Sequence, residues 1–153
     1  MENLPVVDLY TDGACSQNGT WIGGYGAVLI YGDNIKEISG YEENTTNNKM
    51  ELKAVIEGLK ALKRKVSVTV YTDSAYVYNA FKNNWIEAWQ NNGWINSQNK
   101  PVSNKDLWLE LIALCDKHQV SWQKVKGHAD NKYNNQCDKL ATEQIKLHSK
   151  KDE

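Results

Sequence analysis

Short runs of β-branched and apolar residues recur along the chain, in the pattern that is typical of β-strands. A Gly-Asp-Asn turn at 32–34 separates two of these runs and predicts that they pair as a hairpin. The pattern therefore predicts an antiparallel meander of three strands, followed by two more strands later in the chain. The predicted strands are 6–11, 24–31, 35–41, 66–72 and 120–125.

Between and after these runs, the spacing of apolar residues predicts helices. The first helix opens with polar capping residues at Thr45 and ends in a basic turn. The second segment is irregular and is broken by Asn-Asn-Gly before Trp94, and Ser103 is the predicted cap of the next helix. Pro101 excludes regular structure from the loop before that helix. The predicted helical segments are 45–65, 75–94, 105–118 and 134–147.

The succession of a strand, a helix and a strand predicts a parallel crossover. The expected fold class is therefore α/β, with three layers and a five-stranded mixed sheet flanked by helices. A length of 153 residues fits one domain, which we expect over 1–148 because no repeat or linker divides the chain. The charged tail, 149–153, is expected to fray.

Composition narrows the class of protein. Apolar residues make up 41% and charged residues 24% of the chain, which is close to globular averages and argues against disorder.

The sequence also bears on location and assembly. The longest apolar run, 27–31, is far shorter than the ~20 residues of a membrane helix, so no membrane role is expected. No targeting signal is expected either, because the N-terminus lacks a basic region followed by an apolar stretch. Three widely spaced cysteines argue against a disulfide framework and favour the cytoplasm. Without a long apolar heptad, we expect a monomer with no obligate protein partner.

The tripeptide Tyr-Thr-Asp occurs twice, at the predicted ends of the first and fourth strands. If these strands are parallel neighbours, Asp12 and Asp73 lie side by side at the edge of the sheet where ligands bind in such folds. Each has an ordinary alternative, because Asp-Gly is a common turn pair and Asp-Ser commonly starts a helix.

Glu51 lies on the apolar side of its predicted helix, so its carboxylate should point toward the sheet. A lone inward carboxylate is unfavourable, and Asp12 and Asp73 would repel it unless a divalent cation joined them. The alternative is a glutamate favoured near the helix start by the helix dipole.

Three further candidates lie near the end of the chain. Asp138 and Asn134 share one edge of the last helix, and His128 lies in a glycine-containing loop. The ordinary alternative for Asp138 is a solvated position on the helix flank, and for His128 it is a surface histidine.

Six ordered motifs resemble bacterial type 1 ribonuclease H over nearly the whole chain, from Val6 to Leu147. The first four are YTDGAC at 10–15, TTNNKMEL at 45–52, YTDSAYV at 71–77 and NKPVSNKDLW at 99–108. The last two are VKGHA at 125–129 and NNQCDKLA at 134–141.

The resemblance implies a ribonuclease H-like fold and hydrolysis of the RNA strand of RNA/DNA hybrids, leaving 3′-hydroxyl and 5′-phosphate ends. It implies that Asp12, Glu51, Asp73 and Asp138 bind Mg²⁺, with Mn²⁺ possible, as two ions when substrate is bound. It also implies that His128 moves a proton or helps product release, and that Thr46 grips a phosphate of the DNA strand. The other implied substrate-binding residues are Cys15, Asn18, Asn47, Asn48, Ser74, Ala75 and Asn134. For the asparagines, the alternative to substrate binding is a structural role in turns and helix caps.

Three other functions stay open. They are DNA cleavage on the same fold, binding of hybrids without catalysis, and a structural calcium site. All four acidic positions are filled, which argues against loss of catalysis.

The segment 83–99 departs from many bacterial relatives, which carry a basic protrusion there. Here it contains one charged residue, Glu87, and the net charge of the chain is −1. Phosphate neutralisation sets affinity for nucleic acid, so we expect weaker hybrid binding and a shallower salt dependence, which added lysines at 90–92 should reverse. The three tryptophans of the segment are expected to pack it, with stacking on sugars as the alternative.

Overall fold

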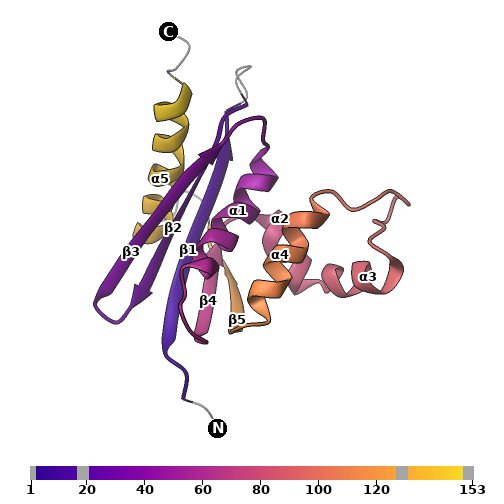
Figure 1. The fold of residues 1–153 in the computed structure, drawn as a ribbon, viewed down its shortest axis with the longest axis horizontal. Helices are drawn as coiled ribbons and strands as arrows, with labels where there is room; N and C mark the ends of the chain where they lie inside the picture. The colour runs from indigo at the N-terminus through magenta and orange to yellow at the C-terminus, as the bar shows by residue number, and fades with distance from the viewer. Residues whose placement is uncertain (1–2, 17–20, 127–130, 150–153) are drawn as a thin grey trace.

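The computed structural model describes residues 3–16, 21–126 and 131–149. Within them the chain forms one five-stranded sheet in the order β3-β2-β1-β4-β5 (Figure 1). The β1–β2 and β2–β3 pairs are antiparallel, whereas β1–β4 and β4–β5 are parallel. The predicted mixed sheet is confirmed. Its strands are β1 (Val6–Cys15), β2 (Gly23–Tyr31), β3 (Asn34–Glu42), β4 (Ser67–Thr72) and β5 (Gln119–Lys124).

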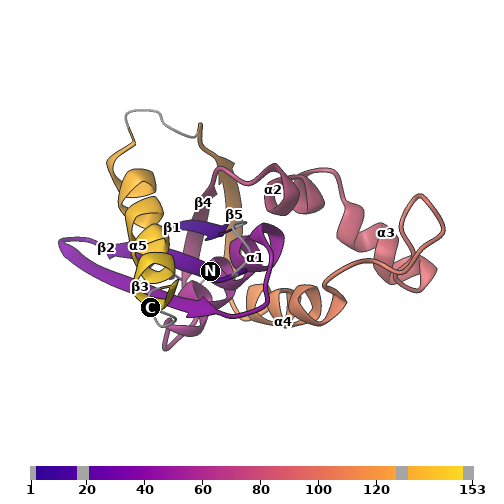
Figure 2. The same ribbon diagram turned by 90° about the horizontal axis from the view of Figure 1, so that it is seen from above.

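Helices cover both faces of the sheet, which gives the expected three layers (Figure 2). α5 packs on β1, β2 and β3, while α1 packs on the other face of β1 and β2 and against α4. α3 projects away from the sheet in both ribbon views (Figures 1 and 2). The helices of the described residues are α1 (Asn47–Lys60), α2 (Ala75–Lys82), α3 (Trp85–Asn92), α4 (Lys105–Cys115) and α5 (Lys132–Ser149).

The main hydrophobic core lies between the sheet and α1. Alternate residues of β1 and β4, such as Leu9 and Val70, point into it and are fully buried. Leu52 and Val55 of α1 and Trp108 of α4 meet them from the other side. The intervening strand residues, including Asp12, therefore face the α5 side of the sheet.

Several predicted boundaries were wrong. β1 continues to Cys15 because its later residues pair with β2, so Asp12 lies inside a strand and not at its end. The helix predicted over 75–94 is two helices, separated where Asn84 adopts a left-handed conformation (φ 59°) that asparagine tolerates. The cap of α4 is Asn104 and not Ser103, and its side chain donates to Tyr76 Oη instead of capping the helix.

The other strands differ from the prediction by one residue at one or both ends. The remaining differences concern helix ends: α1 begins at Asn47, with Thr46 rather than Thr45 as its cap. α1 stops at Lys60 rather than 65, α4 stops at Cys115 rather than 118, and α5 begins at Lys132 and continues to Ser149. Of the predicted tail, 150–153 lies outside the described residues.

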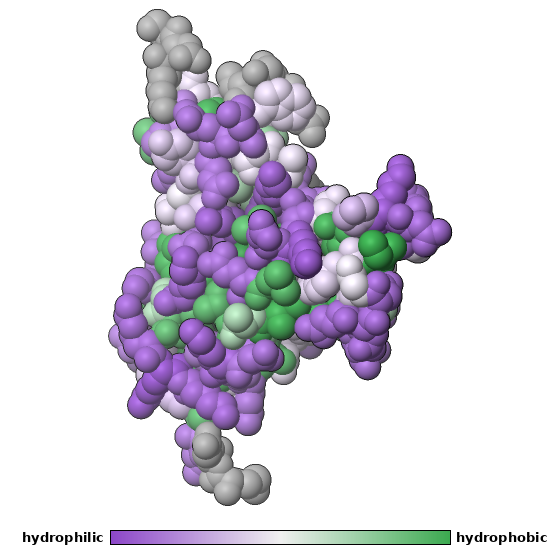
Figure 3. All heavy atoms as spheres, turned by 45° about the vertical axis from the view of Figure 1, so that its right-hand side comes forward, coloured by the Kyte–Doolittle hydropathy of each residue, from purple (hydrophilic) through white to green (hydrophobic). Residues whose placement is uncertain are grey.

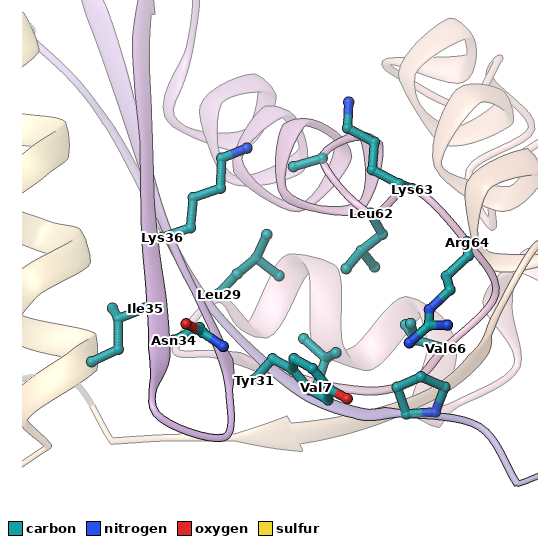
Figure 4. A pocket seen from close by; sticks show the side chains of 12 residues that line it. Val7, Leu29, Tyr31, Asn34, Ile35, Lys36, Leu62, Lys63, Arg64 and Val66 are labelled. Carbon is teal, nitrogen blue, oxygen red and sulfur yellow. The ribbon is translucent and has the colours of Figure 1, made fainter.

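The surface is mostly polar on the face drawn in Figure 3, with apolar atoms gathered near its centre. A hollow of about 440 Å³ opens between the β2–β3 turn and the segment that follows α1, with an apolar floor that includes Val7, Leu29 and Leu62 (Figure 4). Lys36 and Arg64 also line it, and no acidic residue does. Among the described residues, no helix is long and apolar enough to cross a membrane.

Candidate metal centre

Two parallel strands bring Asp12 and Asp73 to the same place. β1 and β4 pair in register as far as Tyr10 and Tyr71, whose rings stack with centroids 4.3 Å apart. Because side chains alternate along a strand, the residues two positions further, Asp12 and Asp73, lie on the same face as these rings. The repeated Tyr-Thr-Asp therefore builds one site.

A glycine brings α1 close enough to complete this site. A Cβ at Gly13 would lie 2.5 Å from the backbone nitrogen of Glu51 and closer still to the carbonyl carbon of Met50. Glycine alone lets β1 and α1 approach so closely. As a result, one carboxylate oxygen from each of Asp12, Glu51 and Asp73 lies within 4.8 Å of the other two. The inward direction predicted for Glu51 from the helical pattern agrees with this arrangement.

Asp138 reaches the site from α5. A Cβ at Gly26 would lie 2.5 Å from the carbonyl oxygen of Cys137, so the absence of a side chain there seats α5 directly on β2. Gly26 pairs with Asp12 in the β1–β2 ladder, and Asp138 follows Cys137. The exposed Asp138 therefore lies beside Asp12, outside the tight group of three.

Like charges and burial raise the pKa values of the inner carboxyl groups. Burial raises the pKa of Asp12 to about 7, aided by the charges of Asp73 and Asp138 and opposed by the backbone N–H of Gly13, which donates to Asp12 Oδ1 (2.9 Å). Burial, together with the charges of Asp12 and Asp73, also raises the pKa of Glu51 well above its usual value. The site thus favours protons or a cation over bare negative charge.

The residues fit a divalent metal ion. Glu51 Oε1 is buried and has no hydrogen-bond partner within the described part of the chain. A buried, unpartnered carboxylate oxygen among two other carboxylates is unfavourable unless a cation binds there. All the donors are hard oxygen atoms, which suit Mg²⁺ or Mn²⁺ better than zinc.

Several predicted substrate-binding residues surround this centre and also stabilise the backbone. Ser74 Oγ caps α2 by accepting from the Val77 N–H (3.2 Å), and Thr46 Oγ1 caps α1 by accepting from the Lys49 N–H (3.2 Å). Asn47 Oδ1 accepts from the Cys15 N–H (2.6 Å) and so joins the end of β1 to the start of α1.

The other predicted residues differ in exposure. Asn48 and Ala75 are exposed at the first turns of α1 and α2. Asn134, expected at the edge of α5, is instead buried (3% exposed), because the start of that helix lies against the sheet. Asn18 and His128 lie outside the described residues.

Sequence reasoning missed two supporting features. It did not predict the capping role of Asn131, whose Oδ1 accepts from the Asn134 N–H (2.9 Å) at the start of α5. It also gave no role to Tyr10 and Tyr71, although the repeated tripeptide contained both.

Comparisons with known proteins agree with this geometry. The RNase H family model matches residues 5–146. The ribonuclease H of Thermoanaerobacter sp. (strain X514) is 63% identical over 148 residues, which is 97% of this chain and 95% of the relative. That of Caldanaerobacter subterraneus subsp. tengcongensis is 62% identical over 148 residues, with 97% and 96% covered.

Solved structures share the fold. LC9-RNase H1, described as a type 1 RNase H with the type 2 active-site motif, superimposes with a TM-score of 0.82 at 29% identity, over 94% of this chain and 73% of that one. LC11-RNase H1, solved in complex with an RNA/DNA hybrid, gives 0.71 at 20% identity over 94% and 99% of the two chains, which is evidence for the fold alone. The chain therefore belongs to the ribonuclease H family and is a hydrolase of that family's endonuclease class.

Proposed function

We propose that this chain hydrolyses the RNA strand of RNA/DNA hybrids and leaves 3′-hydroxyl and 5′-phosphate ends. The observation that carries the proposal is the convergence of Asp12, Glu51 and Asp73 from three separate segments around a buried, unpartnered oxygen. The family membership supports the substrate class, because relatives more than 60% identical are named ribonuclease H.

The proposed metal ligands are Asp12, Glu51, Asp73 and Asp138, which would hold two Mg²⁺ ions, or Mn²⁺, when substrate is bound. Bound ions would supply positive charge to the attacking and leaving oxygens of an in-line displacement. Asp12 is the proposed shared ligand, because Asp73 and Asp138 both act on its carboxylate. Glu51 and Asp138 would bind on opposite flanks of the metal centre, and Asp73 would help to position the ion nearest the attacking water.

Proton movements follow from the same electrostatics. Without a cation, the carboxyl group of Asp12 has a raised pKa, about 7, and holds a proton over part of the neutral range. Binding of a cation would release that proton and leave the Asp12 carboxylate ionised, as a metal ligand must be. His128 is proposed to take up or deliver a proton during turnover, so its loss should slow cleavage without abolishing it.

Hybrid recognition is proposed to use the minor groove, where the 2′-hydroxyl distinguishes RNA from DNA. The proposed contacts surround the carboxylates at the starts of α1, α2 and α5 and at the end of β1. Thr46 is the proposed contact to a DNA phosphate. The other proposed contacts are Cys15, Asn18, Asn47, Asn48, Ser74, Ala75 and Asn134.

The single domain, 1–148, is proposed to act as a monomer without an obligate partner. Its proposed location is the cytoplasm, which agrees with three cysteines that are free thiols.

The test is cleavage of an RNA/DNA hybrid labelled on each strand in turn, with Mg²⁺ and with EDTA. We expect cleavage in Mg²⁺ but not in EDTA, and cleavage of the RNA strand but not of the DNA strand. The products should carry 3′-hydroxyl ends that a polymerase extends. Asp12→Asn and Glu51→Gln should each lower kcat by at least about 100-fold, in keeping with loss of charge stabilisation at a metal site.

The controls separate this function from its alternatives. Binding of the hybrid without cleavage by the parent protein would indicate a binding module, and cleavage of double-stranded DNA would indicate a DNA nuclease. Either result would overturn the proposal.

A further inference from the structure

Three tyrosines form a cluster directly beneath the metal centre. Tyr10 and Tyr71 stack with their rings nearly parallel (7°), and the ring of Tyr133 lies 5.2 Å from that of Tyr10, tilted by 43°. Tyr10 comes from β1, Tyr71 from β4 and Tyr133 from the first turn of α5. We call these three residues the tyrosine cluster.

The lower part of the cluster is anchored in the sheet. Tyr10 and Tyr71 are paired residues of the parallel β1–β4 ladder, and Tyr71 Oη donates to Asp8 Oδ1 (3.4 Å). Burial raises the pKa of Tyr10, and the neighbouring Tyr71 and Asp8 raise it further, so its phenol stays neutral. The stack is therefore a fixed surface on which another ring can rest.

The first two turns of α5 are held by different contacts. In the second turn, the carbonyl of Cys137 rests against Gly26 of β2, which holds Asp138 next to Asp12. At its start, the helix is capped by Asn131, and Tyr133 packs on Tyr10. The residue that follows Tyr133 is Asn134, which is 3% exposed and whose Oδ1 has no hydrogen-bond partner among the described residues.

An amide in this state is suited to bind a ligand. Its backbone N–H is fixed by Asn131, and its side-chain oxygen, left without a partner in a buried place, is available to a donor such as a ribose hydroxyl. The direction of that amide depends on the first turn of α5, and the contact of Tyr133 with Tyr10 holds this turn against β1.

We propose that Tyr133, resting on the Tyr10–Tyr71 stack, is a positioning residue that holds the Asn134 amide in place to bind the RNA strand. The proposal deepens the proposed function and rests on it. Tyr133 acts through Asn134 and makes no contact with substrate itself. The aromatic ring is what matters, and the phenolic hydroxyl does not.

The test compares Tyr133→Ala, Tyr133→Phe and the parent protein on RNA/DNA hybrid. Tyr133→Ala should raise KM about fivefold to tenfold, equivalent to the loss of about one hydrogen bond, and should change kcat less than twofold. Tyr133→Phe should restore the parent KM. Mg²⁺ affinity without substrate, measured by calorimetry, should stay within about twofold of the parent value, because Gly26 rather than Tyr133 holds Asp138 in place.

A double-mutant cycle distinguishes positioning from direct contact. If Tyr133 acts through Asn134, the pair Tyr133→Ala with Asn134→Ala should have the KM of Asn134→Ala alone. Additive effects would mean that Tyr133 touches substrate and would overturn the proposal, as would a tenfold loss of Mg²⁺ affinity. The parent assay comes first, so a failure of the proposed function is seen separately as absence of hybrid cleavage.

Two further variants control for stability. Tyr41→Ala removes an aromatic contact near the far end of α5, the stack of Tyr41 on His148 (3.3 Å between ring centroids), and should leave KM unchanged. Tyr71→Ala weakens the stack from below without altering α5, and it should raise KM in the same direction as Tyr133→Ala. If Tyr133→Ala does not fold, Tyr71→Ala carries the test, and an unchanged KM would overturn the proposal.

Discussion

Asp12 is the residue at which the opposing electrostatic effects meet. It is 7% exposed, accepts one backbone hydrogen bond from Gly13, and lies between the charges of Asp73 and Asp138. One hydrogen bond does not offset burial and two like charges, so the ionised form is unfavourable until a cation arrives. The same features that favour metal binding therefore destabilise the metal-free protein at neutral pH.

This conflict predicts a pH dependence of stability. The pKa of Asp12 is raised from 3.8 to about 7 by folding, and that of Glu51 is raised as well, so both groups bind protons more tightly when folded. Their stabilising contribution is complete below about pH 4 and is lost as pH rises through about 7. The free energy of unfolding in EDTA should fall over this range by roughly 3 to 5 kcal/mol.

Urea unfolding from pH 4 to pH 8 measures this effect. Asp12→Asn should flatten the profile and make the metal-free protein more stable at pH 8. Added Mg²⁺ should stabilise the parent protein at pH 8 and the variant much less. A parent profile that rises toward pH 8 in EDTA would contradict the assigned electrostatics.

The position of a site residue was predictable where the repeating pattern of the sequence determines the direction of its side chain. Helical periodicity was sufficient for the direction of Glu51. The repeated Tyr-Thr-Asp on two strands expected to be parallel neighbours was sufficient for the proximity of Asp12 and Asp73. The burial of Asn134 was not predictable, because it depends on how closely α5 sits on Gly26 of β2. The cap of α4 lies at Asn104, one residue after the predicted Ser103. This position likewise depends on a tertiary contact, the hydrogen bond from Asn104 to Tyr76.

At the scale of elements, two close contacts at glycines determine how near α1 and α5 bring their carboxylates, Glu51 and Asp138, to the sheet. Gly13 lets α1 approach β1, and Gly26 lets α5 approach β2. The sequence shows these glycines but not their partners, since a glycine in a strand is equally consistent with a bulge. For the same reason, the extension of β1 beyond residue 11 was missed.

Gly13→Ala should disrupt the site through α1. The new Cβ would meet the backbone of Met50 and Glu51, which cannot move without shifting the helix. We expect a loss of about 2 to 4 kcal/mol in the free energy of unfolding and a loss of Mg²⁺ binding, both measurable in the purified protein.

The matched control is Gly32→Ala in the β2–β3 turn. Its Cβ would meet nothing within 4 Å, although its positive φ (59°) disfavours alanine. It should cost only about 1 kcal/mol and leave Mg²⁺ binding intact. Equal effects of the two variants on Mg²⁺ binding would exclude the close contact as the cause.

The protrusion, 83–99, is held by packed tryptophans. Trp89 lies 5.4 Å from buried Trp108 and 5.7 Å from Trp94, whereas Trp85 is 40% exposed. The packing role predicted for these rings thus agrees with the contacts of Trp89. The break between α2 and α3 was not predictable from periodicity, because both helices are rich in similar residues.

Trp89→Ala should therefore lower the free energy of unfolding by about 2 kcal/mol and speed amide exchange in α3, because the half-buried ring joins α3 to α4. Trp85→Ala should lower it by less than about 1 kcal/mol. Chemical unfolding and hydrogen exchange of the two variants give the comparison. A larger effect of Trp85→Ala would mean that the exposed ring, and not Trp89, anchors the protrusion.

At the scale of the whole molecule, one basic group lies apart from the acidic centre. The carboxylates lie where β1 and β4 stop pairing, whereas Lys36 and Arg64 line the hollow near Val7, toward the start of β1. The order of strands and helices was predictable, since the crossover between antiparallel and parallel pairs follows from connection lengths. The net charge of −1 was known too, but its distribution over the surface required the structure.

The protrusion offers the clearest test of how charge affects substrate binding. Within it, Gln90 and Asn91 are exposed on α3, and Glu87 is the one charged residue. Asn92 is a poor site for a lysine, although the sequence made it a candidate, because its amide donates to the Ile95 carbonyl (2.9 Å) and accepts from the Ile95 N–H (3.1 Å). The pair Gln90→Lys and Asn91→Lys adds charge without disturbing that turn.

If the protrusion lies along the hybrid, this double variant should bind it more tightly at low salt and with a steeper dependence on salt. Each new phosphate contact adds about 0.9 to the slope of log K against log salt, so two contacts should add between about 1 and 2. Fluorescence anisotropy with a labelled hybrid, measured in the non-cleaving Asp12→Asn background from about 50 to 200 mM salt, provides both numbers. Gln90→Ala with Asn91→Ala is the matched control and should leave the slope unchanged. An unchanged slope in the lysine variant would show that the protrusion does not approach the phosphates, and the weak binding predicted from its missing charges would then have no basis.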